Sequence, residues 1–456
     1  MTATKYLQQL FKKYNPSVNG IARIAKINGG ILSQYMNGKR EINNFDTYVR
    51  IAKAMGVSDR EYTKLCELYF TEVYSSSELD AVKTIIAELP CVLKDASVFP
   101  VKKSADMPTD GCPANKEQID SAIVSLCEKS NGNIYTNIPF TDKAIDDCLF
   151  SLSQKENINL IRFFETSDDA PDTDDIRALM RTLRFLRYGC FPYVVDKSHG
   201  IDNTDIFPYF VVTENGFVMC NESFGILSSD AQTTRKIAEK TENIRASAKQ
   251  FGKRLENILD LVSFGGTDIN KTVETGYVSA FPCVGPYLTR DDMAASANDI
   301  PNKDALIDMC YAHYSRIGVC DIAKYTTQKG IFDFAKTGNF YSMPPMFVHG
   351  LPAKNRRDVL DRIAADIEND TLFIINTDVL SIPDEFIMDY EGVNVALTAF
   401  DGSVDQFCVS DIYHKTNSPY YMKLAKLFLQ YLKNGRYTYD KQAALHIVEC
   451  AKELAV

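Results

Sequence analysis

The segment that decides how the amino-terminal end folds is residues 19–57, NGIARIAKINGGILSQYMNGKREINNFDTYVRIAKAMGV. Asn28 can cap a helix over residues 29–36, because its side chain can accept hydrogen bonds from the first backbone amides. Gly38 would end this helix, since glycine adopts the left-handed conformation without strain. Leu32 would face the core. These features predict a short helix with one buried face and one face presented outward.

Other helices surround this one. Apolar residues at helical spacing indicate a helix before it and a longer helix after it, which Gly56 ends. They are Ile21, Ala22 and Ala25 in the first and Phe45, Tyr48, Val49, Ile51, Ala52, Ala54 and Met55 in the second. Residues 4–14 show the same spacing and predict an earlier helix. A short helix, a tight turn and an outward second helix form the arrangement that places side chains in the DNA major groove.

This segment resembles the lambda-repressor-like, or XRE-type, helix-turn-helix of phage and bacterial repressors. The likeness is carried by Ile21-Ala22, Leu32, the run Tyr35-Met36-Asn37-Gly38-Lys39-Arg40 and the closing run Ile51-Ala52-Lys53-Ala54-Met55-Gly56-Val57-Ser58. Two features depart from the family pattern. Lys26 stands where the family often has glycine, and it would need a positive φ. Gly29 and Gly30 stand where the family usually has long polar side chains that read bases.

The resemblance implies that the outward helix contacts double-stranded DNA. The expected contact residues are Asn28, Gly29, Gly30, Ser33, Gln34, Asn37, Lys39 and Arg40. Gln34 would face outward and pair with adenine or another base edge. Lys39 and Arg40 lie past the helix end, where they would meet backbone phosphates. A single head makes few contacts, so a homodimer on paired half-sites is expected.

Charge is unevenly distributed along the 456 residues, whose formal net charge is −10. Residues 1–60 hold six lysines and four arginines against three acidic residues, a net charge of +7, so the remainder carries −17. A basic end on an acidic body points to a phosphate-seeking surface at that end. The 12 cysteines are scattered singly, as in reduced intracellular proteins. No hydrophobic signal segment or bilayer-length apolar run occurs, so we expect a cytoplasmic protein without a membrane partner.

The chain is long enough for two or three domains. We expect an all-α head over residues 1–74, a connecting helix and linker over 75–116, and a mixed α/β body over 117–456, with a possible break near 264–302. The fold class is therefore α+β. The body resembles the uncharacterised carboxy-terminal region of XRE-type regulators of Gram-positive gut bacteria. That likeness is carried by Ile138-Pro139-Phe140, residues 207–219, residues 327–338 and the last two predicted helices.

Three patterns in the body predict local structure. Residues 207–219 read as a β-hairpin, because an Asn-Gly pair separates two apolar runs. Residues 233–262 read as one long helix with apolar positions every seven residues, which fits either a core helix or a dimer seam. Arginines also recur at helical spacing and are expected to form a charged outer stripe: Arg177, Arg181, Arg184 and Arg187. No internal sequence repeat is found.

No local signature of catalysis occurs. The five histidines lie in no nucleophile or metal motif, and no phosphate-binding loop or dinucleotide fingerprint is present. An acidic loop over residues 168–175 lacks the glycine spacing of a calcium loop, so a solvated loop that caps the next helix is expected. We therefore expect no cofactor, no metal and no enzymatic activity.

The sequence favours a sequence-specific transcriptional regulator whose body dimerises or senses a small-molecule or peptide effector. Two alternatives remain open. One is an antitoxin-like or protein-binding adaptor that uses the helical head for protein contacts. The other is an enzyme that carries a DNA-binding head. Steep salt dependence of binding would favour DNA as the partner, and a pocket of ionisable groups with shifted pKa values would favour an enzyme.

Overall fold

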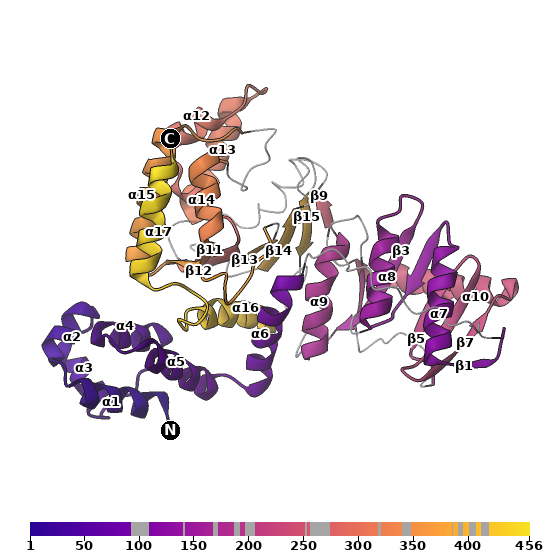
Figure 1. Ribbon diagram of the computed structural model, residues 1–456, viewed down its shortest axis with the longest axis horizontal. Coiled ribbons are helices and arrows are strands. Elements are labelled where there is room, and N and C mark those ends of the chain that lie inside the picture. The colour runs from indigo at the N-terminus through magenta and orange to yellow at the C-terminus, as the bar shows by residue number, and fades with distance from the viewer. Residues whose placement is uncertain are drawn as a thin grey trace.

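The fold class is α+β, as predicted: a helical head is followed by two α/β units. Figure 1 shows the head below the second unit and the first unit at the opposite end of the long axis. The computed structural model describes residues 1–92, 109–139, 142–166, 172–186, 192–196, 206–250, 253–255, 274–317, 321–339, 348–384, 386–390, 395–400, 407–411 and 419–456.

The helical head consists of five helices whose starts are set by short polar side chains. They are α1 (Ala3–Tyr14), α2 (Val18–Ile24), α3 (Gly29–Met36), α4 (Phe45–Met55) and α5 (Asp59–Val73). Ser17 caps α2, and Asn44 caps α4 through the backbone amide of Thr47. Lys26 adopts the expected positive φ, 52°, in the turn between α2 and α3. Gly56 ends α4 with a φ of 63°. The helices predicted around residues 19–57 are therefore confirmed.

The first α/β unit contains a mixed sheet in the order β1-β7-β6-β5-β2-β3-β4-β8. Its strands are β1 (Pro113–Asn115), β2 (Asn133–Thr136), β3 (Asn159–Thr166), β4 (Tyr193–Asp196), β5 (Tyr209–Thr213), β6 (Gly216–Cys220), β7 (Phe224–Ser228) and β8 (Lys249–Gln250). Its helices are α7 (Lys116–Glu128), α8 (Lys143–Ser153), α9 (Thr173–Leu186) and α10 (Ala231–Ser247). Strands β2, β3 and β4 run parallel, and α8 and α9 connect them.

The second α/β unit contains a sheet in the order β12-β11-β10-β13-β14-β15-β9. Its strands are β9 (Lys253–Leu255), β10 (Thr275–Ser279), β11 (Asp321–Thr327), β12 (Leu372–Ile375), β13 (Phe386–Tyr390), β14 (Val395–Phe400) and β15 (Phe407–Asp411). Its helical segments are η2 (Gly285–Tyr287), α12 (Arg290–Ser296), α13 (Lys303–Ile317), α14 (Gln328–Thr337), α15 (Ala353–Glu368), α16 (Pro419–Leu432) and α17 (Lys441–Leu454).

The two units repeat one topology. When the second sheet is read from β9, its order β9-β15-β14-β13-β10-β11-β12 matches β1-β7-β6-β5-β2-β3-β4 of the first sheet, strand for strand. Each matched neighbour pair also has the same direction, with two parallel pairs (β2·β3 and β3·β4, β10·β11 and β11·β12) and antiparallel pairs elsewhere. This duplication of topology is not accompanied by a recognisable repeat in the sequence.

The helices cover corresponding faces of the two sheets. In the first unit, α8 and α9 pack on one face, and α10 packs on the other over Phe163, Phe210 and their neighbours. In the second unit, η2 and α12–α15 come from the connections between the parallel strands, and α16 packs on β10, β11, β13 and β14. The connections between parallel strands place helices on one face. The opposite face is therefore free for α10, which follows β7, and for α16, which follows β15.

The head is packed against the second unit. Helix α6 (Ser76–Glu88) and the short η1 (Leu89–Cys91) follow the head, and α6 contacts both α9 and α16. The Phe70 ring of α5 lies 5.1 Å from the Tyr431 ring of α16, centroid to centroid. The Tyr62 hydroxyl donates a hydrogen bond to the carbonyl of Lys433 at 2.8 Å. These contacts hold the head in one orientation.

Two predicted elements differ from the structure. The helix expected over residues 233–262 ends at Ser247, because Ala248 is extended and the chain then forms β8 against β4 and β9 against β15. Sheet pairing therefore overrides the seven-residue apolar pattern, and residues 256–262 lie outside the described residues. The hairpin at 207–219 is confirmed, but its turn is Glu214-Asn215, since Gly216 already pairs with Thr213.

None of the helices in the described parts of the chain has the length and hydropathy that a bilayer crossing requires.

Candidate functional site

The start of α3 is fixed by Asn28. Its Oδ1 accepts hydrogen bonds from the backbone amides of Gly30 at 2.9 Å and Ile31 at 3.3 Å. Gly29 faces α2, where an added Cβ would lie 3.3 Å from Oδ1 of Asn19. Gly30 is exposed. The cap predicted at Asn28 is confirmed, and the first turn of α3 presents backbone rather than side chains.

The outward face of α3 is the face that the sequence predicted. Leu32 is fully buried, whereas Gln34 is exposed. Ser33 is half-buried, and its Oγ accepts a hydrogen bond from Nδ2 of Asn37 at 3.3 Å. The backbone amide of Lys39 donates to the carbonyl of Gln34 at 2.9 Å, which closes the helix with Gly38 in the left-handed conformation. Of the eight predicted contact residues, six are exposed and Gly29 and Ser33 are half-buried.

Four exposed cations lie on this part of the head: Arg23 in α2, Lys26 in the turn, and Lys39 and Arg40 after α3. Across the described residues none of them forms an ion pair with a carboxylate. The guanidinium of Arg40 lies 5.9 Å from the centroid of the Tyr35 ring. Unpaired cations in one region attract an acidic partner and speed its approach.

An exposed isoleucine lies close in sequence to two of these cations. Ile24, the last residue of α2, is 62% exposed and lies between Arg23 and Lys26 in the sequence. We call Arg23, Ile24, Lys26, Gln34, Lys39 and Arg40 the α2–α3 surface. Figure 1 shows α2 and α3 at the outer end of the head, away from the first α/β unit. Ile24 was not among the residues predicted for a contact surface, and its exposure at the end of α2 appears in the structure.

Ion pairs join the opposite side of the head to the body, one with its cation on the head and one with its cation on the body. Nζ of Lys53 lies 2.9 Å from Oδ1 of Asp370, and Nζ of Lys433 lies 3.5 Å from Oδ1 of Asp46. Both ammonium groups also lie within 5.8 Å of the centroid of the Phe373 ring. Burial lowers the pKa of Lys433. These contacts attach the head to the second unit and leave the α2–α3 surface uncovered.

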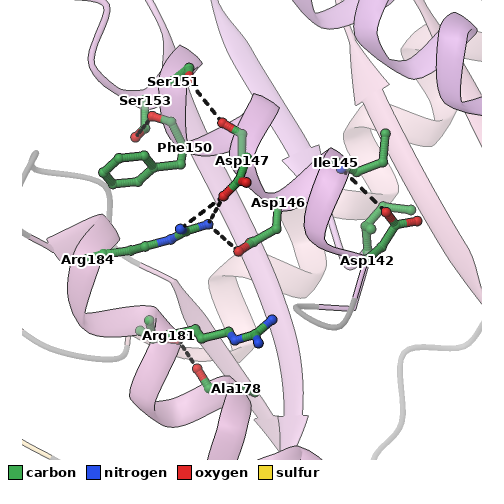
Figure 2. A network of polar contacts seen from close by, with 12 residues as sticks. Asp142, Ile145, Asp146, Asp147, Phe150, Ser151, Ser153, Ala178, Arg181 and Arg184 are labelled. Carbon is green, nitrogen blue, oxygen red and sulfur yellow. Dashed lines mark hydrogen bonds and ion pairs between the residues drawn. The ribbon is translucent and has the colours of Figure 1, made fainter. Parts of the chain in front are cut away.

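A second cluster of charged residues lies inside the first α/β unit (Figure 2). Arg162 of β3 is fully buried, forms an ion pair with Asp146 of α8 and donates to the carbonyl of Ile138 at 2.9 Å. Arg184 of α9 pairs with Asp146 and, at 3.2 Å, with Asp147. The prediction of an outer stripe is therefore wrong for Arg184, which is buried, while Arg177 and Arg181 are half-buried and Arg187 lies outside the described residues.

Aromatic rings close this network against solvent. The guanidinium of Arg184 lies 4.7 Å from the centroid of the Phe150 ring, and that of Arg162 lies 5.1 Å from the Phe185 ring. Two cations and two carboxylates balance in charge. A network that is balanced in charge and buried among the described residues fits a structural role, since a buried ion pair needs close partners to offset desolvation.

The second unit holds a related but more open cluster. Lys324 of β11 is buried, and its Nζ lies 3.0 Å from Oδ2 of Asp366 in α15, which also accepts a 2.6 Å hydrogen bond from the Tyr287 hydroxyl. Arg362 of α15 lies 3.2 Å from Asp292 of α12. The side chains of Asp366 and Arg362 are 26% and 38% exposed. Both units thus place a cation on the second parallel strand, facing the connecting helices.

Comparison with known proteins gives few matches. No family model matches the chain, and no curated protein matches it. Among solved structures, a similar chain is the crystal structure of phosphatidylserine synthase from Haemophilus influenzae Rd KW20, with 11% sequence identity and a TM-score of 0.23 over 71% of this chain and 85% of that chain. A TM-score this low transfers neither fold nor activity.

These findings correct the assignment made from the sequence. The XRE-type family is not supported for the head or for the body, because no family model and no curated protein matches the chain. The function that followed from that assignment, a DNA-binding transcriptional regulator, loses its support for the same reason. The expectation that the chain is not an enzyme is also withdrawn, since it rested on absent motifs alone.

Proposed function

We propose that this chain is a protein-binding adaptor whose helical head contacts an acidic surface of a protein partner. The observation that carries the proposal is Ile24, which is 62% exposed and lies between Arg23 and Lys26 in the sequence, on a head where these two cations, Lys39 and Arg40 have no carboxylate partner in the described residues. Burying an exposed isoleucine contributes about 1.5–3 kcal/mol. The surrounding cations would select an acidic rim and raise the rate of association.

The composition of the α2–α3 surface favours protein over nucleic acid as the partner. Gly29 and Gly30 leave the first turn of α3 without side chains, so few groups there could read base edges. Ile24 offers apolar area that a phosphate backbone does not match. An apolar centre with a charged rim, including arginine, is the usual composition of a protein–protein interface.

The body supports this function by holding the head still. The contacts of Lys53 with Asp370, of Lys433 with Asp46 and of Phe70 with Tyr431 fix the head on the second unit. A surface that is already oriented loses less conformational entropy on binding than a tethered one. The two α/β units would then serve as a rigid carrier.

Site-specific photo-crosslinking tests the proposal. A photoreactive amino acid at position 24 of the full chain should give a discrete protein adduct in cells. Lys39→Glu together with Arg40→Glu should remove the adduct, because they reverse the charge of the rim. Val73, which is 52% exposed on α5, provides a control position away from this surface.

Two results would overturn the proposal. One is an adduct pattern at position 24 that equals the pattern at position 73. The other is binding of the purified chain to duplex DNA at physiological salt that Lys39→Ala weakens, because the surface would then serve a nucleic acid.

A further inference from the structure

Helix α13, at the far side of the second unit, carries two large exposed apolar side chains, which lie on different faces of the helix because they are two residues apart. Met309 is 41% exposed and Tyr311 is 39% exposed. Ala305 and Ala312 lie on the same face as Met309 and are also exposed, so this face is not covered by another element of the described chain. Figure 1 places α12 and α13 at the end of the second unit away from the head.

Carboxylates surround this apolar face. Asp304 and Asp308 lie on α13, Asp291 lies on the adjoining α12, and all three are exposed. Arg290 forms an ion pair with Asp308 at 2.7 Å. Asp308, and to a smaller extent Asp304 and Asp291, raise the pKa of Arg290. Three carboxylates against Arg290 and the half-buried Lys303, whose Nζ donates to the carbonyl of Ala297 at 2.9 Å, leave this region with one net negative charge. We call Asp291, Asp304, Asp308, Met309 and Tyr311 the α13 surface.

We propose that the partner of the α2–α3 surface is a second copy of this chain, bound through its α13 surface; this rests on the proposed function. The two surfaces are complementary in charge, with Arg23, Lys26, Lys39 and Arg40 on one and three carboxylates on the other. Each also has an apolar centre. The two surfaces of a single chain cannot meet, because they lie at opposite ends of the head and second unit (Figure 1).

The geometry of this contact sets the form of the assembly. Each chain offers one surface of each kind, so every contact joins two different surfaces. Such contacts either close into a ring, of which a dimer with two contacts is the smallest, or continue as an open chain. The charged rims make the association sensitive to salt, since exposed charges are screened over about 8–10 Å at moderate ionic strength.

Sedimentation velocity on full-length chains tests the inference by charge reversal. The wild type should associate with rising concentration at low salt and dissociate as salt increases. Lys26→Glu with Lys39→Glu, and separately Asp304→Lys with Asp308→Lys, should each reduce the association at least tenfold. A 1:1 mixture of these two variants should associate again, because each reversed surface now matches the reversed surface of the other. Asp378→Lys with Glu222→Lys changes charge at exposed sites elsewhere and should behave as wild type.

The outcome separates this inference from the proposed function. If the mixture of reversed variants stays monomeric, or if the wild type is monomeric throughout, the second copy is not the partner. The proposed function would still stand if position 24 crosslinks to a different protein. A crosslink from position 24 to a peptide containing residues 304–312 of a second chain supports both.

Discussion

The two α/β units have the same strand order but different polar interiors. In the first unit, the strand cation is Arg162, which is fully buried beneath Phe185 and paired with a carboxylate of the helix before its strand. In the second unit, the strand cation is Lys324, which pairs with Asp366 of a helix after its strand. A quarter of the Asp366 side chain remains exposed. The shared topology fixes where the cation sits, and the side chains around it decide whether water reaches the pair.

This difference has an energetic consequence. A closed ion pair depends on its partners, because removing one leaves an uncompensated buried charge. A pair with an exposed member keeps water as a substitute partner, so it should tolerate the same change better. Four changes, ordered from the largest expected effect to the smallest, test this contrast.

Arg162→Met should have the largest effect. It leaves Asp146 and Asp147 with Arg184 as the remaining cation of the network, and we expect a loss of about 3–5 kcal/mol in the free energy of unfolding of the first unit. Hydrogen exchange of peptides from each unit during urea titration measures this loss separately for the two units. Arg177→Met is the control, because Arg177 is partly exposed on α9 and should cost less than about 1 kcal/mol.

Lys324→Met should cost less, about 1–3 kcal/mol, in the second unit. The Tyr287 hydroxyl still donates to Asp366, and solvent reaches that carboxylate. The same exchange measurement applies. A loss as large as that of Arg162→Met would show that the two clusters are equally closed and would remove the contrast.

Asp292→Asn tests the second unit by pH. Burial raises the pKa of Asp292, but hydrogen bonds from Thr289 and Asn355 and the charge of Arg362 outweigh it, so the pKa lies below its ordinary value. A lowered pKa means that the carboxylate stabilises the fold above its unfolded pKa of about 3.9. This contribution is lost as pH falls through the lower, folded value.

The stability difference between wild type and Asp292→Asn should therefore be constant from neutral pH to about pH 4 and shrink below it. Thermal unfolding midpoints measured across this range give the result. A difference that grows with acidification would mean that the folded carboxyl binds protons more readily than the unfolded one.

Arg290→Ala should have the smallest effect. Arg290 and Asp308 are 47% and 61% exposed, and exposed ion pairs contribute roughly 0.2–1 kcal/mol. A change in thermal midpoint of more than a few degrees would indicate that the α13 surface supports the fold. The charge reversals at that surface would then need to be interpreted as folding defects.

The helical head could be predicted from sequence because its signals are local. Asn28 caps a helix within its own turn, and Gly38 and Gly56 end helices by adopting a positive φ. The cap, the helix and its end lie within a dozen residues. The positive φ of Lys26 was also expected, since Lys26 stands at a turn position where the helix-turn-helix pattern often has glycine.

The duplicated topology could not be predicted, because its signals are not local. Strand β11 mixes apolar and polar residues and contains Lys324, which is buried. A lysine within a strand does not indicate a central, buried position, so the sequence pattern did not predict one. Arg184 was expected to face solvent because its carboxylate partners lie 37 and 38 residues away. Ile24 carried no sequence signal of its own, and it is exposed because α2 ends there.

The affinity of Ile24→Ala for the protein that position 24 crosslinks is the most direct test of the account. Ile24 is exposed, so its truncation should leave the thermal midpoint unchanged. We expect binding, measured by calorimetry with purified full-length chains, to weaken on the order of tenfold or more, as the loss of a buried isoleucine side chain requires. Equal affinities for wild type and Ile24→Ala would contradict the claim that the α2–α3 surface is a protein-binding site.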